Sequence, residues 1–227
     1  MPTQFPTTNP PLVCWNCHER TIGTHFCGSC GKVLQVPEST DYFSMFEMPR
    51  KLWIEMGVLE QKFLQLSWKL HPDNFVNSTE QERAISLKRS SELNDAYRTL
   101  RDPIARVEYL LAIEGTRKNG ENKQSAPPEL LEEVFELNES LNELREAKSS
   151  GGDAASLKRR LETAEKNFEG KLSEVDSELQ TTAREWDKSV DSGDSAQGKT
   201  VMTKLNELLN RRSYIRNLVV NVQKELL

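Results

Sequence analysis

The sequence predicts an all-α chain made of a helical hairpin, a C-terminal three-helix bundle and a small N-terminal metal-binding module. Three observations indicate this class. Of the 227 residues, 36% are hydrophobic and 29% are charged, which is typical of helices with one buried face. All four cysteines lie between residues 14 and 30. After residue 40 the apolar residues follow helical spacing, and no strand is needed to explain them.

Composition divides the chain into five segments. Residues 1–11 are rich in proline and threonine without any charge, and we expect them to be disordered. The cysteine module covers 12–37, and an aromatic-rich helical segment covers 41–115. Residues 116–128 are polar without hydrophobic periodicity, which predicts a linker before the helical bundle of residues 129–227.

The bundle is predicted from three stretches whose apolar residues recur at alternating steps of three and four. This is the spacing of helices packed at shallow angles. The first stretch comprises Leu130, Val134, Leu137, Leu141 and Leu144. The second runs over 157–186 and the third over 201–226, where Arg212 interrupts the pattern. We expect breaks between these helices at 148–153 and 191–199, where glycine, serine and aspartate gather.

The segment 41–115 predicts a helical hairpin followed by a short helix. A first stripe consists of Leu59, Phe63, Leu66 and Leu70, and it should end near Leu70 because proline at 72 disfavours helix before it. The second helix should start after Asn77, where Ser78 or Thr79 can cap it and Glu82 lies at capping-box distance from Thr79. Its apolar positions are Ala84, Leu87, Leu93, Tyr97 and Leu100. The short helix should run from Pro103 to about Ile113.

The loop of the hairpin reads His71-Pro72-Asp73. Taken alone, this tripeptide is an ordinary turn with a histidine at a helix end. Its setting is less ordinary, because the preceding helix carries Lys62 and Lys69. Proline narrows the conformations of such a loop, and an exposed aspartate accepts charge-assisted hydrogen bonds from a cation on a partner. No nucleophile–base pair or phosphate loop is visible in the sequence, so we predict a protein that is not an enzyme.

The whole arrangement, from Asp41-Tyr42-Phe43 to the segment NDAYRTLRDP at 94–103, resembles the J domain of DnaJ-type co-chaperones over residues 41–114. In that family the loop and the basic face of the preceding helix engage an ATP-bound chaperone and trigger hydrolysis. The resemblance therefore implies that His71, Pro72 and Asp73 bind the chaperone, with Lys62 and Lys69 as supporting cations. The chain departs from the family at Asn74, where a lysine is usual.

The four cysteines form two Cys-x-x-Cys pairs, namely Cys14 with Cys17 and Cys27 with Cys30. Four thiolates close a tetrahedral site as structural zinc prefers, so we predict one zinc ion. Disulfides would need an oxidising compartment, and a redox pair would be expected beside a βαβ pattern. A [2Fe–2S] cluster takes the same four ligands, so the spacing leaves that alternative open.

Four neighbours of the cysteines have secondary roles in this prediction. We expect His18 and His25 to be bystanders, since four cysteines already complete the ligand set. Gly28 and Gly31 should relieve the tight turns of the second pair. The basic residues that a nucleic-acid-binding zinc ribbon requires are scarce here.

The helix after residue 129 has more apolar residues than its seam uses. Leu131 and Phe135 lie off the stripe, beside Glu132, Glu136 and Glu139. They either widen the buried stripe or form an exposed apolar patch rimmed by acids, which is a binding surface.

The segment ELLEEVFELNESL at 129–141 is similar to the client-binding helix of HscB-type proteins, whose partner is the iron–sulfur scaffold protein. The resemblance implies that these five residues and Tyr214, on the last helix, contact the scaffold. Glu132 departs from the family, which usually has an apolar residue there. DPIARVEYLL at 102–111 also resembles the HscB type, and the cysteine module resembles the zinc-binding extension of some eukaryotic members.

The resemblance implies a co-chaperone that stimulates ATP hydrolysis by a DnaK/HscA-class chaperone and delivers the iron–sulfur scaffold protein to it. The alternative is a general J-domain co-chaperone for unfolded clients, whose C-terminal helices form a coiled-coil homodimer. A net charge of −5 gives no basis for nucleic-acid binding. Because no apolar run approaches the ~20 residues of a membrane helix, we expect a soluble chain.

The N-terminus lacks the apolar core of a signal peptide and the arginines of a transit peptide. The family resemblance implies the mitochondrial matrix, with the cytosol as the alternative.

Overall fold

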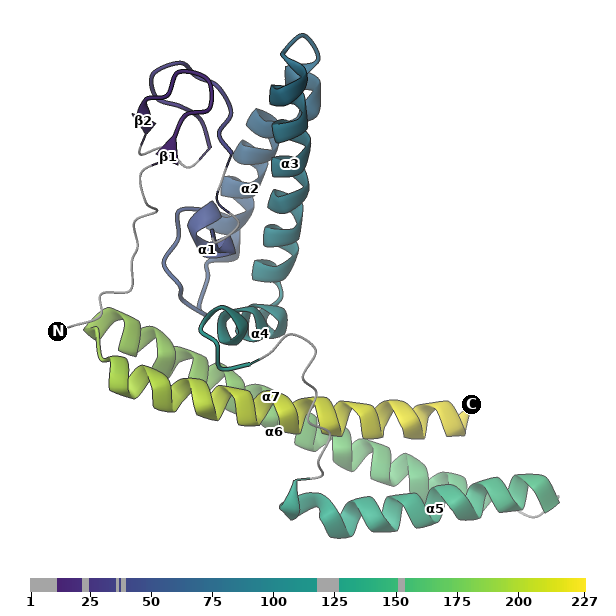
Figure 1. Cartoon of the computed structure of the whole chain (residues 1–227). Helices are drawn as coiled ribbons and strands as arrows, with labels where there is room; N and C mark the ends of the chain where they lie inside the picture. The colour runs from purple at the N-terminus through teal and green to yellow at the C-terminus, as the bar shows by residue number, and fades with distance from the viewer. Residues whose placement is uncertain (1–11, 22–24, 36, 38–39, 118–126, 151–153) are drawn as a thin grey trace. The chain divides into compact units, whose positions relative to one another are not determined.

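The computed structural model describes residues 12–21, 25–35, 37, 40–117, 127–150 and 154–227. Helices make up nearly all of its regular structure, which confirms the predicted all-α class (Figure 1). The chain forms two compact units: unit 1 comprises residues 1–115 and 184–199, and unit 2 comprises 116–183 and 200–227. The domain boundaries expected from composition stay a prediction. Among the described helices, none has the length and apolarity that a bilayer span requires.

Unit 1 begins with a small module whose strands are very short. β1 (Leu12–Val13) pairs antiparallel with β2 (Arg20–Thr21), and an isolated bridge joins Phe26 to Val33. The buried core of the module consists of little more than Cys14, Cys27 and Leu34. So few apolar side chains cannot support a fold alone, and such modules depend on a metal ion or a neighbour.

The helical hairpin of unit 1 consists of α2 (Met56–Leu70) and α3 (Glu80–Arg101). The short α1 (Tyr42–Met45) precedes it, and α4 (Pro103–Ile113) follows. The predicted ends of α2 and α4 are confirmed, because prolines stand where helix must stop or start. At the start of α3, the hydroxyl oxygen of Thr79 accepts a hydrogen bond from the Glu82 N–H at 3.3 Å, which confirms the predicted cap.

The predicted apolar stripe of α3 is wrong in its first half. Leu87 is 64% exposed and Ala84 is exposed too, whereas Leu100 at the far end is buried as expected. The buried face near the helix start instead carries Ile85 and Ser86 together with two charged residues, Glu82 and Arg89, which are almost inaccessible to solvent. The charged residues are buried there because the N-terminal module supplies partners for them. The apolar periodicity of α3 cannot predict contacts with that module.

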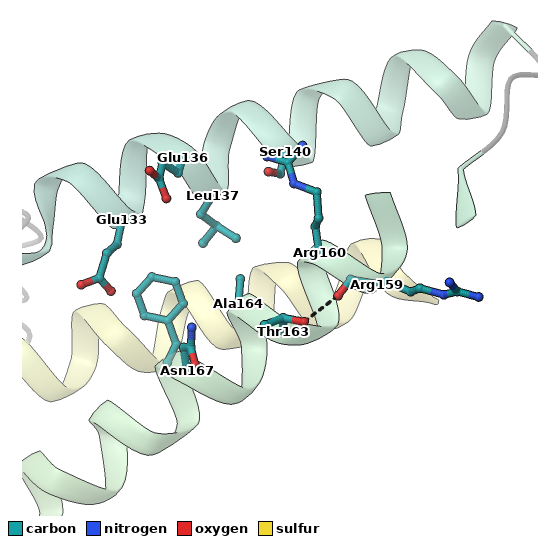
Figure 2. A pocket seen from close by; sticks show the side chains of 10 residues that line it. Glu133, Glu136, Leu137, Ser140, Arg159, Arg160, Thr163, Ala164 and Asn167 are labelled. Carbon is teal, nitrogen blue, oxygen red and sulfur yellow. Dashed lines mark hydrogen bonds between the residues drawn. The ribbon is translucent and has the colours of Figure 1, made fainter. Parts of the chain in front are cut away.

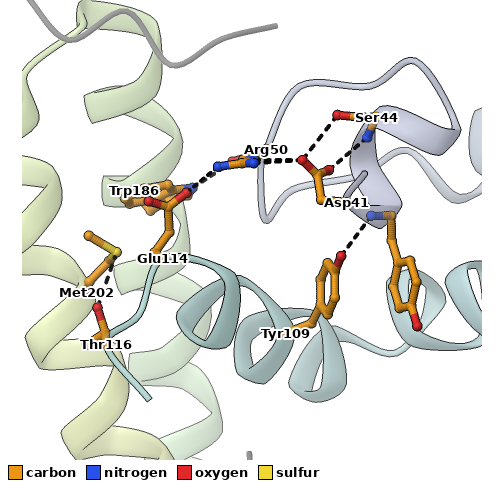
Figure 3. Close-up of polar contacts among 9 residues, drawn as sticks. Asp41, Ser44, Arg50, Tyr109, Glu114, Thr116, Trp186 and Met202 are labelled. Carbon is orange, nitrogen blue, oxygen red and sulfur yellow. Dashed lines mark hydrogen bonds and ion pairs between the residues drawn. The ribbon is translucent and has the colours of Figure 1, made fainter. Parts of the chain in front are cut away.

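A polar network joins α1 to the segments around it (Figure 3). Asp41 caps α1 by accepting from the Ser44 N–H at 2.9 Å, and its other carboxylate oxygen pairs with Arg50 at 2.7 Å. The same guanidinium reaches Glu114 at 2.7 Å, just beyond α4. The hydroxyl of Tyr109 in α4 accepts from the backbone N–H at the start of α1 at 2.8 Å. Burial raises the pKa of Tyr109 to about 12, so this hydroxyl stays neutral.

Residues 184–199, which are the end of α6 (Ala155–Ser192), a short turn and the start of α7 (Ser195–Leu226), also belong to unit 1. There Trp186 is fully buried, and its indole N–H donates to the Arg50 carbonyl oxygen at 2.8 Å. The two carboxylate oxygens of Asp187 accept from the backbone N–H groups of Leu52 and Trp53 at 2.7 and 2.8 Å. These hydrogen bonds hold the segment before α2 against the end of α6.

The break expected at 191–199 is much shorter in the structure. α6 ends at Ser192, Gly193 turns the chain with a φ of 69°, and α7 already begins at Ser195. Asp194 caps α7 by accepting from the N–H groups of residues 196 and 197. Gly198 lies inside α7, where a Cβ would meet the Trp186 ring at 3.4 Å. This glycine therefore permits a close approach and does not break the helix.

Unit 2 contains α5 (Leu131–Ser150), preceded by a single 3-10 turn, η2 (Pro128–Leu130), together with most of α6 and α7. The five seam residues predicted for the first helix are all buried. Ion pairs tie α5 to α6 through Glu133 and Lys171, and α5 to α7 through Arg145 and Glu225. Arg212, which interrupts the seam of α7, reaches across to a carboxylate on α6 at 2.5 Å. The predicted three-helix bundle is therefore confirmed.

The other expected irregular segments are only partly described. Residues 148–150 belong to α5, so the first break is also shorter than expected, and 151–153 lie outside the described residues. In the expected linker, Arg117 donates to the side-chain oxygens of Asn206 and Asn210 on α7. Residues 118–126, like the expected disordered segment 1–11, lie outside the described residues.

Candidate functional site

The loop between α2 and α3 forms an exposed corner. Residues 72–75 make a 3-10 turn, η1 (Pro72–Phe75), which His71 caps because its Nδ1 accepts from the Asp73 N–H at 3.3 Å. The His71 and Asp73 side chains are 54% and 85% exposed, and Nδ1 lies 3.6 Å from the Asp73 carboxylate. The corner therefore presents an imidazole and a carboxylate together on a proline-stiffened turn.

The departure at Asn74 has a structural consequence. Its side-chain amide donates to the Trp68 carbonyl oxygen at 2.6 Å, which ties the corner to the last turn of α2. Lys62 is half-buried and Lys69 exposed on α2, seven residues apart and hence on the same side of the helix. Within the described chain, neither ammonium group has a carboxylate within 4 Å. Both lysines therefore contribute unneutralised positive charge beside the corner.

The four cysteines converge in the N-terminal module. Their sulfur atoms all lie within 4.8 Å of one another, with Cys14 and Cys30 at 3.6 Å and Cys17 and Cys27 at 3.6 Å. A tetrahedral zinc ion with Zn–S bonds of about 2.3 Å requires sulfur atoms about 3.8 Å apart. The N–H groups of Cys30 and Ser29 lower the pKa of the Cys27 thiol to about 6, which favours a thiolate. Geometry and chemistry thus fit a metal ion on four sulfurs.

Each Cys-x-x-Cys pair ends in the same tight turn. The N–H of His18 bonds to the Cys14 carbonyl oxygen, and the N–H of Gly31 bonds to the Cys27 carbonyl oxygen, both at 2.9 Å. His18 and Gly31 each stand four residues after the first cysteine of their pair. Both have a positive φ, 60° for His18 and 71° for Gly31. The prediction for Gly31 is confirmed, but Gly28 does not have a positive φ and a Cβ there would meet nothing.

The module is attached to the helices by buried polar contacts. His25 is not a spare residue as expected: its Nε2 bonds to the Met45 carbonyl oxygen at 2.9 Å and its Nδ1 to the Arg89 guanidinium at 2.8 Å. Burial, helped by the Arg89 charge, lowers the pKa of His25 to about 4, so the imidazole is neutral. A neutral ring fits both bonds, because Nε2–H donates to the carbonyl and Nδ1 accepts from arginine.

A second contact lies about two turns earlier on α3. The Lys32 ammonium pairs with the Glu82 carboxylate at 2.6 Å, and Glu82 is only 3% exposed. The Glu82 side chain therefore points to the module, while the backbone N–H of Glu82 donates to Thr79 in the helix cap. Lys32 and His25 together place the metal-binding module on the helical hairpin within unit 1.

In unit 2, α5 has an exposed strip with apolar and acidic side chains. Phe135 is 71% exposed and Leu131 is 55% exposed, and both lie on the side of α5 away from its seam. Glu132, Glu136 and Glu139 are exposed beside them. Of the two interpretations that the sequence left open, the structure therefore favours the exposed patch.

A groove next to this strip runs between α5 and α6 (Figure 2). Glu136 lies at the groove, where Glu133 pairs with Lys171 of α6 at 3.0 Å and Arg160 pairs with Glu143 at 3.3 Å. Glu133 and Arg160 in the lining of the groove are therefore each paired with an opposite charge. Tyr214, the remaining predicted contact, is half-buried on α7.

Sequence reasoning missed the residues that hold these surfaces in place. His25, Arg89 and the pair Lys32–Glu82 act between segments 50 or more residues apart. Asp187 acts across more than 130 residues, on backbone groups that have no sequence signal. Local periodicity cannot reveal such partners.

A helical hairpin with an exposed His-Pro-Asp corner, followed by a three-helix bundle, is the arrangement that the resemblance to J-domain co-chaperones implied. No family model matches the chain. An iron–sulfur cluster co-chaperone protein HscB homolog from Arabidopsis thaliana is 35% identical over 136 residues, 60% of this chain and 53% of that protein. A co-chaperone protein HscB homolog from Aliivibrio salmonicida is 36% identical over 104 residues, 46% of this chain and 61% of that protein.

The mouse iron–sulfur cluster co-chaperone protein HscB is 29% identical over 212 residues, 89% of this chain and 81% of that protein. The chain thus spans little more than half the length of the first two relatives and most of the third. These relatives confirm the predicted resemblance to the HscB co-chaperones.

Two solved structures are similar in fold. The crystal structure of human co-chaperone protein HscB matches with a TM-score of 0.62 at 23% identity, over 94% of this chain and 98% of that chain. Chaperone HscB from Vibrio cholerae matches with a TM-score of 0.50 at 22% identity, over 82% and 96%. At these identities the likeness shows the fold alone.

Proposed function

We propose that this chain is a co-chaperone of iron–sulfur cluster assembly that stimulates ATP hydrolysis by a DnaK/HscA-class chaperone and delivers the scaffold protein to it. The observation that carries the proposal is the exposed corner of His71 and Asp73 at the end of a packed hairpin, in a chain whose relatives are HscB co-chaperones. In this proposal the chain activates its partner and is not itself an enzyme. Its proposed compartment is the mitochondrial matrix, as the eukaryotic relatives suggest.

The corner would act by docking. Asp73 offers a carboxylate that is 85% exposed, so an arginine of the chaperone can bond to it without displacing an internal partner. Pro72 limits the conformations of the turn, which lowers the entropy lost on binding. Lys62 and Lys69 would mainly speed encounter with an acidic chaperone surface.

The strip on α5 would bind the scaffold protein. Leu131 and Phe135 supply apolar area that is already exposed, and Glu132, Glu136 and Glu139 form its acidic rim. Tyr214 is the proposed contact on α7. Tethering the scaffold raises its local concentration at the chaperone, so delivery needs no further chemistry.

The four cysteines would hold one structural zinc ion. When bound, zinc supplies the cross-link that a core of three buried side chains cannot provide. Cys14, Cys17, Cys27 and Cys30 are the proposed ligands, and the sulfur spacing supports this assignment.

The first test measures single-turnover ATP hydrolysis by the cognate chaperone with increasing amounts of this chain. We expect His71→Gln to abolish the stimulation, because the corner loses its imidazole. His18→Gln is the matched control, an exposed histidine in the same unit away from the corner, and it should stimulate like wild type. A His71→Gln variant that stimulates fully would refute the proposed role of the corner.

The second test measures binding of the folded scaffold protein by calorimetry. The double variant Leu131→Ala with Phe135→Ala should weaken binding at least about tenfold, since exposed apolar anchors dominate such interfaces. Leu87→Ala, another exposed leucine, should bind normally. If the chain binds unfolded clients and not the folded scaffold, the alternative of a general J protein is favoured.

A further inference from the structure

Three buried polar residues on one face of α3 connect the cysteine module to the end of α2. Glu82, Ser86 and Arg89 follow one another at steps of four and three, so they lie on the same side of the helix. Their exposed fractions are 3%, 0% and 2%. The outer two residues contact the module, and Ser86 between them contacts α2.

Ser86 holds the end of α2. Its hydroxyl donates to the carbonyl oxygen of Leu70 at 2.8 Å, and both residues are fully buried. Leu70 is the last residue of α2, where backbone carbonyl groups have no partner within their own helix. His71 follows directly, so the path of the chain into the corner depends on where Ser86 holds this carbonyl. Asn74, by contrast, ties the corner to α2 itself.

The module holds α3 on both sides of Ser86. About one turn before it, the Glu82 carboxylate pairs with the Lys32 ammonium at 2.6 Å. About one turn after it, the Arg89 guanidinium bonds to the His25 imidazole at 2.8 Å. Both contacts join segments 50 or more residues apart in the chain. They therefore fix the first turns of α3 relative to the module.

The other bonds of these groups do not replace the module. Arg89 also pairs with Glu92 at 3.2 Å, three residues later on the same helix. This ion pair moves with α3 and cannot determine where the helix lies. The His25 ring also bonds to the Met45 carbonyl oxygen at the end of α1, at 2.9 Å, which again requires the module to be folded.

The module cannot maintain these contacts through its own core, which consists of little more than Cys14, Cys27 and Leu34. When bound to the four thiolates, a metal ion supplies the missing cross-link. Without that cross-link, each contact of Lys32 and His25 with α3 must offset the entropy of ordering the whole segment. The position of α3, and through Ser86 the end of α2, therefore depends on the state of the four cysteines.

We propose that the cysteine module is a metal-dependent clamp on α3, and that Ser86 is the positioning residue that transmits the clamp to the His71 corner. This inference rests on the proposed function and adds its regulation. With the metal bound, the corner is held in the geometry that the chaperone binds, and without it part of the binding free energy is lost in ordering the corner. Coupling of this kind is reciprocal, so chaperone bound at the corner raises the affinity of the cysteines for metal by the same factor.

The first test titrates the full chain, with zinc(II) bound or removed, into the chaperone in single-turnover ATP hydrolysis. Metal removal should raise the half-maximal concentration at least about fivefold, the lower end of typical coupling between sites. Zinc-loaded Ser86→Ala should show a similar rise, and metal removal should then add less than about twofold, because the transmitting contact is already lost. Ser91→Ala, at an exposed serine of α3, is the matched control and should respond to metal like wild type.

A second variant acts at the other end of the connection. Lys32→Ala keeps all four cysteines and removes the contact with Glu82. It should bind zinc(II) and still raise the half-maximal concentration, to a smaller extent than metal removal, because the contact of His25 with Arg89 persists. Far-UV circular dichroism checks that Ser86→Ala is folded. If it is not, Lys32→Ala takes its place in the comparison.

Two further measurements do not depend on ATP hydrolysis. The chain has three histidines, so comparison with His71→Gln assigns the His71 ring resonance in an NMR spectrum. Metal removal should shift this resonance in wild type and leave it in place in Ser86→Ala. Competition with a chelator measures the affinity for zinc(II), which the ATP-bound chaperone should raise at least about fivefold in wild type and less than about twofold in Ser86→Ala.

The outcomes separate the clamp from the proposed function. If metal removal changes the half-maximal concentration less than about twofold while His71→Gln abolishes stimulation, the clamp is wrong and the proposed function stands. If zinc-loaded wild type does not stimulate, the proposed function fails, and an unshifted His71 resonance on metal removal then overturns the clamp as well. Ser86→Ala that responds to metal like wild type would refute transmission through Ser86. A purified chain that binds no zinc(II) would overturn the proposal as a whole.

Discussion

The carboxylate of Asp187 offers a sharp test of how unit 1 is held together. It accepts two backbone N–H groups, from Leu52 and Trp53, at 2.7 and 2.8 Å, and it is only 9% exposed. Asp187→Asn keeps the shape of the side chain but replaces one acceptor oxygen with an NH2 donor. One of the two backbone N–H groups then faces a donor and loses its partner.

The magnitude follows from these contacts. Leaving a buried N–H unsatisfied costs about 1–3 kcal/mol, and exchanging a charged for a neutral acceptor weakens the other bond by about 1 kcal/mol. Burial raises the pKa of Asp187, which means that removing its charge recovers part of this loss. We therefore expect Asp187→Asn to lower the free energy of unfolding by about 2 kcal/mol, from the balance of these contributions.

Asp191→Asn on the same helix is the matched control. Asp191 pairs with Lys51 at 2.6 Å, but its side chain is 64% exposed, so its loss should cost between 0 and about 1 kcal/mol. Urea unfolding, followed by tryptophan fluorescence, to which buried Trp186 contributes, and by circular dichroism, measures both variants. If the two variants are equally stable within error, the reasoning about the two backbone bonds is refuted.

Two further predictions concern the metal-binding module. His25→Ala should destabilise unit 1 by about 2–3 kcal/mol in urea unfolding, because Arg89 loses a buried acceptor. The control His18→Ala, at an exposed site, should change stability by less than about 0.5 kcal/mol. Equal effects of the two variants would show that the contact with Arg89 is not stabilising. If the four cysteines hold the proposed metal ion, a chelator should unfold the cysteine module and expose Glu82 at the start of α3, because the module covers that side chain. Hydrogen exchange with and without the chelator measures this, and unchanged protection of α3 would contradict it.

The sequence by itself determined the elements whose signals are local. Proline at 72 and at 103 marks where α2 must stop and α4 must start, and both positions hold in the structure. The two Cys-x-x-Cys pairs predicted a four-sulfur site, because ligands three residues apart meet at one ion wherever the module lies. The bundle seam of α5 followed from its spacing alone.

Tertiary structure decided what depends on partners far away in the chain. Glu82 is buried on α3 although it is charged, because Lys32 arrives from a segment 50 residues earlier. Gly198 serves a close approach to Trp186 and not a helix break, which only the packed side chains reveal. Burial of a charge is favourable only where a distant group completes its hydrogen bonds, and a local pattern cannot encode which segment that will be.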